Sequence, residues 1–94
     1  FDLEQQKKYL LKEIDQAYFN ARNAYAEQQA AEKAEQSTIE ALRYTTQKYE
    51  AGRCSLYEYQ EARNNHLQAQ STRLQAQYNY LFRLRILQYY QGVL

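Results

Sequence analysis

The chain has 94 residues, of which 12 are basic and 11 acidic, and a formal net charge of +1. This length allows one small domain, and the balanced charge argues against a nucleic-acid-binding module, which would gather positive charge on one face. A single cysteine excludes an internal disulfide and a thiolate metal cluster. No apolar run approaches the roughly 18 residues needed to span a bilayer. The start at Phe1, just ahead of a helix, suggests a segment excised from a longer protein.

The first expected element is a helix over residues 3–51, because residues that favour helix fill most of its positions. Asp2 is a candidate N-cap, with Gln5 three residues later as its capping-box partner. One line of this helix follows a strict 4,3 spacing: Leu10, Ile14, Ala17, Ala21, Ala24, Gln28, Ala31, Glu35, Thr38, Leu42, Thr45 and Tyr49. A second line has a period of seven: Leu11, Tyr18, Tyr25, Ile39 and Thr46.

The break between the two long helical stretches lies at residues 52–55. Gly52 is the only glycine before position 92, and the chain has no proline. We expect Gly52 to adopt the left-handed conformation that ends a helix. Ser55 is the expected N-cap of the next helix, with Glu58 as its capping-box partner.

The second expected element is a helix over residues 56–91, ended by Gly92. Alanines recur every seven residues in it, as do leucines: Ala62, Ala69 and Ala76, then Leu67, Leu74 and Leu81. Five residues of helix rotate by about 140°, so the two lines cannot share one narrow seam. Two lines per helix predict that each helix has more than one neighbour, although an ordinary antiparallel bundle with an irregular core fits the periodicity equally well.

The fold class is therefore all-α, a long antiparallel two-helix coiled-coil hairpin with arms of roughly 70 and 57 Å. Folding at residues 52/53 pairs positions whose numbers sum to about 105, which places Tyr25 level with Tyr80 and Tyr49 level with Leu56. The end far from the turn, hereafter the root, is rich in aromatic and aliphatic residues. The middle is polar and rich in glutamine, so we expect it to face water on at least one side.

Three sequence elements at matching distances resemble the TolC-type outer-membrane efflux protein family. The turn and the start of the second helix, residues 49–63 (YEAGRCSLYEYQEAR), are similar to the family's tip, and residues 76–81 (AQYNYL) followed by Gly92 are similar to the end of its second helix. Residues 14–18 (IDQAY) resemble its V-x-x-A-Y element. The resemblance covers nearly the whole chain and fits the second of the family's two internal repeats best.

The resemblance implies a segment of a larger α-helical barrel that projects through the periplasm from the outer membrane. It implies a homotrimer that acts as a passive conduit for drugs or secreted proteins, with no enzymatic activity and no cofactor. The tips would close the entrance and dock a periplasmic adaptor, which links the channel to an inner-membrane transporter. An isolated segment with uncovered lateral lines should self-associate.

The resemblance also assigns candidate sites. The adaptor-binding tip would comprise Tyr49, Gly52, Arg53, Ser55 and Leu56. Arg53 departs from the small or apolar residue usual in the family, which leaves the identity of the adaptor open. Glu58 and Glu61 share one helix face. They form either a solvated pair at a helix N-terminus or part of an acidic ring at the pore entrance. The helix-packing seams would comprise Ile14, Ala17, Ala21, Leu42, Ala62, Leu67, Ala69, Leu74, Ala76 and Leu81.

Other residue types do not indicate chemistry. Cys54 is interpreted as an incidental small residue, and His66 as a polar residue in the seam, because no further metal ligands stand at suitable spacing. The 11 tyrosines are scattered over both arms without a basic groove, and no catalytic constellation or phosphate-binding loop occurs. The alternative to a channel segment is a stand-alone coiled-coil interaction or spacer module, which would have no reason to combine this tip with two lines per helix.

Overall fold

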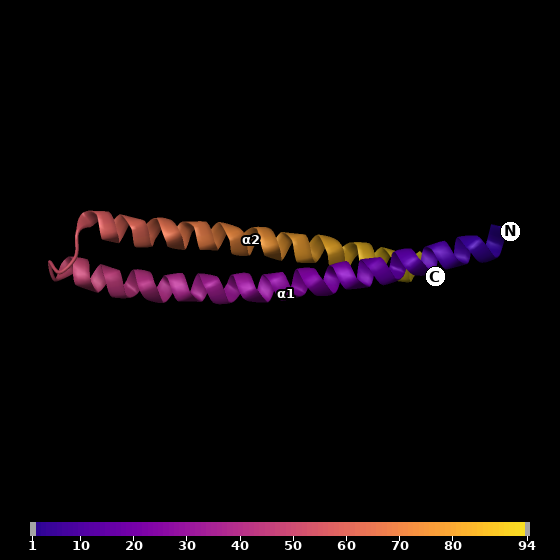
Figure 1. The fold of residues 1–94 in the computed structure, drawn as a ribbon, viewed down its shortest axis with the longest axis horizontal. Coiled ribbons are helices and arrows are strands. Elements are labelled where there is room, and N and C mark those ends of the chain that lie inside the picture. The colour runs from indigo at the N-terminus through magenta and orange to yellow at the C-terminus, as the bar shows by residue number, and fades with distance from the viewer. Residues whose placement is uncertain (1, 94) are drawn as a thin grey trace.

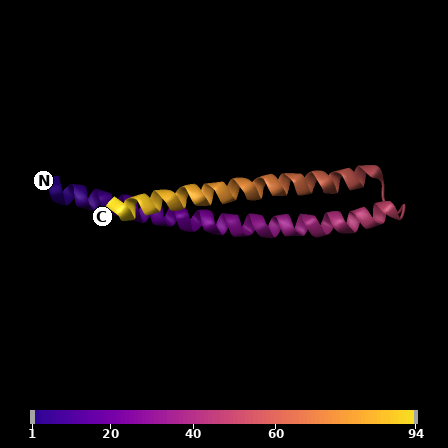
Figure 2. The same ribbon diagram turned by 180° about the vertical axis from the view of Figure 1, so that it is seen from behind.

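The computed structural model describes residues 2–93, which form two helices, α1 (Asp2–Glu50) and α2 (Leu56–Val93). They fold back on each other as a hairpin that measures 75 × 17 × 13 Å (Figure 1). The predicted all-α antiparallel hairpin is confirmed. The first turns of α1 extend past the end of α2, as the opposite view also shows (Figure 2). The side chain of Asp2, the predicted N-cap, lies outside the described part of the structure.

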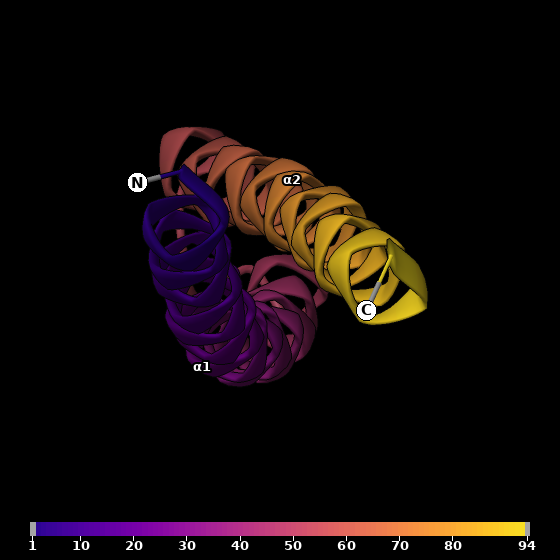
Figure 3. The ribbon, with the colours of Figure 1, turned by 90° about the vertical axis from the view of Figure 1, so that its right-hand side faces the viewer.

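The two helices meet along the 4,3-spaced line of α1. Four alanines of this line are buried: Ala17, Ala21, Ala24 and Ala31. Leu87 of α2 is buried against the first two of them. The predicted pairing holds, since the rings of Tyr25 and Tyr80 lie 5.3 Å apart between centroids. Small side chains let the helix backbones approach closely. Viewed from the root, the two helices cross at an angle (Figure 3). In the side view the two helices overlap near the root because they cross there (Figure 1).

The largest buried apolar side chain, Leu87, lies towards the root, while the buried alanines continue from there to Ala31 near mid-length. Ala17, Ala21 and Leu87 form a buried cluster, with Ile86 and Tyr90 packed against it. None of the described side chains is fully buried, and many large apolar ones are exposed along the rest of the hairpin. The fold thus places its modest apolar packing between the root and mid-length and leaves the turn far from it. Neither described helix contains a stretch apolar enough to cross a lipid bilayer.

The end of α2 differs from the expectation that Gly92 stops the helix. The helix continues through Gly92 to Val93, and Gly52 is the glycine with a positive φ in the described chain. A glycine within a helix costs only about 1 kcal/mol relative to alanine, so a glycine with no adjacent turn residues does not by itself end the helix.

Candidate functional site at the hairpin tip

The turn at the tip is built around Gly52, whose φ is +72°. The Gly52 N–H donates to the Tyr49 carbonyl at 3.0 Å, and the Arg53 N–H donates to the Lys48 carbonyl at 2.7 Å. These two bonds form a Schellman motif, which satisfies carbonyls that the helix end leaves without partners. The prediction of a left-handed glycine at this position is confirmed. The motif fixes the direction in which the chain leaves α1.

Ser55 starts the second helix as predicted. Its Oγ accepts a hydrogen bond from the Glu58 N–H at 3.2 Å, and its carbonyl accepts the first helical bond from the Tyr59 N–H at 3.2 Å. A serine at this position stabilises a helix by about 1 kcal/mol relative to alanine. The tip is therefore capped on both sides of the turn.

Side chains from both helices hold the tip together. The ring of Tyr49 stacks on that of Tyr59, with centroids 5.0 Å apart and an interplanar angle of 14°. Leu56, the partner expected from the pairing rule, is instead half-exposed, because the turn carries the start of α2 away from α1. The Cys54 thiol donates to the Thr45 carbonyl at 3.6 Å, so this cysteine takes part in closing the turn.

The outward side of the tip is exposed and mixed in character. Arg53, Leu56 and Tyr57 all face solvent, and the Tyr57 side chain is 73% exposed. Glu58, next to Tyr57, and Glu61, one turn further along α2, are also exposed. The structure thus brings the predicted tip residues together at one end of the hairpin. Tyr49 lies there too, but its ring is stacked on that of Tyr59. Tyr57, two positions after the N-cap Ser55, was not among the predicted residues.

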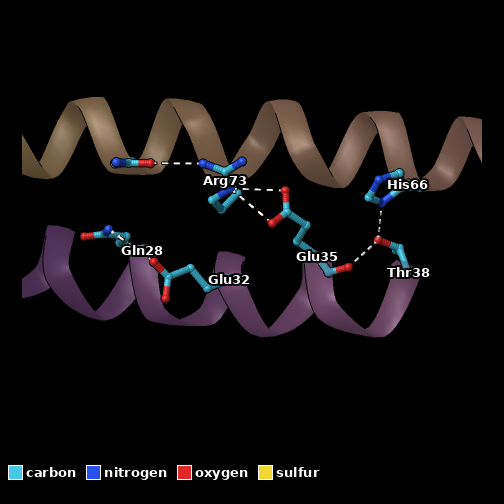
Figure 4. Close-up of polar contacts among 7 residues, drawn as sticks. Gln28, Glu32, Glu35, Thr38, His66 and Arg73 are labelled. Carbon is cyan, nitrogen blue, oxygen red and sulfur yellow. Dashed lines mark hydrogen bonds and ion pairs between the residues drawn. The ribbon is translucent and has the colours of Figure 1, made fainter. Parts of the chain in front are cut away.

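A layer of polar side chains joins the helices midway along the hairpin (Figure 4). The Arg73 Nε donates to both carboxylate oxygens of Glu35 at 3.2 and 3.1 Å, and Arg73 Nη1 donates to Gln77 Oε1 at 3.0 Å. Thr38 Oγ1 donates to the Glu35 carbonyl at 2.7 Å and lies 3.3 Å from His66 Nδ1. Because the only hydroxyl proton of Thr38 is used, His66 Nδ1 is the donor in this contact. The interpretation of His66 as a polar seam residue is confirmed.

The predicted seam residues divide into two groups. Those of α1, together with the alanines of α2, face the partner helix and are buried or half-buried: Ile14, Ala17, Ala21, Leu42, Ala62, Ala69 and Ala76. The leucine line of α2 is exposed: Leu67, Leu74 and Leu81 at 51, 42 and 45%. On α1, Leu11, Tyr18 and Tyr25 of the second line are likewise exposed. One line per helix is covered within the hairpin. The other is exposed on α2, and on α1 it is exposed at Leu11, Tyr18 and Tyr25 but half-buried at Ile39 and Thr46.

Within residues 2–93, no three His, Cys, Asp or Glu side chains are grouped so that they could hold a metal ion. A long hairpin with a capped, exposed tip and an uncovered apolar line on each helix defines a building block of helical assemblies. A family model described as outer membrane efflux protein matches residues 2–92, so the chain belongs to this family. No significant match is found among curated proteins or among solved structures.

The family is one of TolC-like transport proteins of the outer membrane rather than of enzymes. Its members act as trimeric channels with adaptor partners. Membership favours a role in efflux over that of a stand-alone spacer. The conformation of the turn is confirmed, whereas the binding roles of its residues stay predictions.

Proposed function

We propose that this hairpin is a periplasmic segment of the α-barrel wall of a trimeric outer-membrane efflux or secretion channel. In this proposal the channel is a passive conduit, and the hairpin tip both gates its entrance and docks the periplasmic adaptor, which links it to an inner-membrane transporter. The observation that carries the proposal is the tip itself. A doubly capped turn presents Arg53, Leu56 and Tyr57 to solvent at the far end of a 75 Å hairpin.

Gly52 gives the adaptor its closest approach. A Cβ placed on Gly52 would meet no atom within 4 Å, so the space beside it is open to a partner. Leu56 and Tyr57 supply apolar contact area next to this opening, Arg53 supplies a charge, and Ser55 holds the helix start in place. Tyr49 supports the surface from behind through its stack on Tyr59. Exposed aromatic and arginine side chains are the residue types enriched at interaction hot spots.

The test uses the channel protein that carries this hairpin. It compares two substitutions in order to distinguish the effect of side-chain volume from that of backbone strain. Gly52→Ala adds strain at φ +72° but little volume, whereas Gly52→Phe adds both. We expect Gly52→Phe to lose drug resistance and adaptor co-purification while channel trimers still assemble, and Gly52→Ala to retain most of both. Normal resistance in the Gly52→Phe strain would refute docking at the tip.

The acidic pair adds selectivity at the entrance. Glu58 and Glu61 are both exposed, and each copy of a trimer contributes two such carboxylates. Carboxylates gathered around a narrow mouth concentrate cations there. In the reconstituted channel, Glu58→Gln/Glu61→Gln should reduce both cation selectivity and block by multivalent cations, whereas the exposed Glu40→Gln, far from the tip, should change neither. Unchanged selectivity in the double variant would leave these residues as a solvated pair.

A further inference from the structure

The acidic pair at the tip begins a line of residues that follows one side of α2 to the root. Glu58 and Glu61 each precede by one position a half-buried residue of the seam, Tyr59 or Ala62. Residues at the same three- and four-residue spacing share a side of the helix. Beyond the acidic pair, the line consists of exposed uncharged polar residues and then of apolar ones: Asn65, Gln68, Thr72, Gln75 and Asn79, then Phe82, Ile86 and Tyr89.

Helix α1 presents a matching line on the same side of the hairpin. A shallow groove formed by both helices shows this, because Ala34 of α1 lines it together with Asn65, Gln68 and Thr72 of α2. The line of α1 also precedes its seam positions by one. From the turn towards the root it contains mainly small or uncharged residues between two charged ones: Lys48, Tyr44, Ala41, Ser37, Ala34, Ala30 and Glu27. These two lines are hereafter the amide side.

The opposite side of the hairpin, formed by residues that follow the seam positions by one, has a different chemistry. Tyr25 and Leu74 are exposed there, and Glu32 is half-buried. Arg43 and Arg63 are exposed on it nearer the turn. Large apolar groups on a surface indicate contact with other protein. This mixed side therefore suits neighbouring protein better than it suits a stream of dissolved solute.

The middle of the amide side is a neutral belt. Over residues 30–41 of α1 and 65–79 of α2, the two lines expose neither a charge nor a large apolar group. The belt is about 21 Å long. Glu61 and Lys48 lie beyond its end nearer the turn, and Glu27 lies at its other end. Because the Debye length is about 8 Å at physiological ionic strength, the middle of the belt is largely screened from these charges.

We propose that the amide side lines the conduit and that its neutral belt passes solutes of either charge, so that selection by charge is confined to the mouth. This inference rests on the proposed function, in which Glu58 and Glu61 face the entrance. The residues that continue their line along α2 then face the same space. Amide and hydroxyl groups both donate and accept hydrogen bonds, so they interact with water, anions and cations alike. The substrates are therefore polar solutes of either sign.

The same assignment places Lys48 in the mouth. The pairing rule puts Lys48 level with Glu58, and its Nζ lies 5.3 Å from the centroid of the Tyr44 ring on the same line. Each copy then contributes two carboxylates and one ammonium to the mouth, which is a net charge of −1. Lys48 therefore reduces the cation selectivity that the acidic pair supplies. Arg63, on the opposite side, has no such effect.

The first test measures reversal potentials of the reconstituted channel protein in a salt gradient at low ionic strength. Gln75→Glu should raise the ratio of cation to anion permeability about twofold or more, and Gln75→Lys should lower it similarly, because charges that line a cleft concentrate ions of opposite sign. Gln70→Glu and Gln70→Lys are the matched controls, since Gln70 is an exposed glutamine on the opposite side of α2. A response at Gln70 and not at Gln75, or at neither, would overturn the proposal.

The second test removes a charge instead of adding one. Lys48→Gln should raise the ratio of cation to anion permeability, whereas Arg63→Gln should leave it unchanged. An unchanged ratio in Lys48→Gln, or a rise in Arg63→Gln alone, would contradict the placement of the amide side in the conduit. The proposed function fails differently, through a protein that forms no trimer or conducts no ions. This inference fails in a trimer that conducts but whose selectivity does not respond to Lys48 and Gln75.

Discussion

Arg73 of α2 holds both carboxylate oxygens of Glu35 of α1 with its Nε, at 3.2 and 3.1 Å (Figure 4). The two side chains are 23 and 13% exposed, so both charges are largely removed from water. The pair lies on the seam, between alanines of α2 too small to bury much area. Register between the helices at mid-length thus depends on a charge contact as well as on apolar packing.

Glu35→Gln should destabilise the hairpin, because it leaves the Arg73 guanidinium in the seam without an anion. We expect a loss of about 1–3 kcal/mol, below the value for a fully buried pair because both groups keep some contact with water. Urea denaturation at a fixed chain concentration measures this loss. Glu40→Gln, which removes an exposed carboxylate, is the control. Equal unfolding midpoints for the two variants would show that the ion pair adds nothing.

Substitution of Gly52 should destabilise the hairpin because of the backbone conformation at this position and not because of contacts with neighbouring atoms. Its φ is +72°, while an added Cβ would meet no atom within 4 Å. Gly52→Ala should therefore cost about 1 kcal/mol, and Gly52→Asn clearly less, because asparagine tolerates the left-handed region. Thermal unfolding of the two variants distinguishes these cases. If alanine and asparagine were equally costly, crowding at the tip rather than backbone strain would be responsible.

Sequence reasoning recovered the features that depend on local rules. The glycine at the end of α1, the serine at the start of α2 and the level of Tyr25 with Tyr80 all follow from backbone geometry and helix rise. Spacing also placed His66 in the seam. Each of these predictions needs only the positions of Cα and Cβ atoms.

What the sequence did not reveal depends on side-chain reach and on the detailed geometry of the turn. Tyr49 stacks on Tyr59 rather than packing on Leu56, which the pairing rule places level with it. Arg73 reaches Glu35, three positions off the level predicted by the pairing rule, because its side chain is long. The Cys54 contact with Thr45 requires the turn geometry in full. The roles of Arg53, Glu58 and Glu61 depend on partners and stay predictions.

Alanine substitutions at Tyr49 and Tyr57 should distinguish a residue that stabilises the tip from a residue that binds the adaptor. Tyr49→Ala removes a stacked pair, which contributes about 0.5–1.5 kcal/mol beyond the area it buries. Tyr57→Ala removes a side chain that is 73% exposed and should change stability by no more than about 0.5 kcal/mol. Chemical denaturation of the hairpin tests both values. In the channel, the order should reverse for adaptor binding, with Tyr57→Ala the more damaging; the same order in both assays would contradict the assignment of Tyr57 to the docking surface.

Tyr90 makes the stability of the root sensitive to alkaline pH. Its hydroxyl donates to Glu13 Oε2 at 3.4 Å. Partial burial, together with the negative charge of Glu13, raises the pKa of the Tyr90 phenol above its ordinary value of 10.0. The folded state therefore keeps the proton longer than the unfolded chain does. The contribution to stability is complete below that ordinary pKa and is lost as the pH rises through the raised one.

Absorbance titration of the phenolates should place Tyr90 late among the tyrosines, so Tyr90→Phe should remove amplitude from the alkaline end of the curve. Glu13→Gln removes both the charge and the charged acceptor, and should shift that late step towards lower pH. Over the same interval, the fall in the free energy of unfolding should be shallower for Tyr90→Phe than for the wild type. Tyr89→Phe is the matched control, because Tyr89 is adjacent in sequence and its own ring is exposed. Loss of the late step in Tyr89→Phe instead of Tyr90→Phe would contradict the contact with Glu13 as its cause.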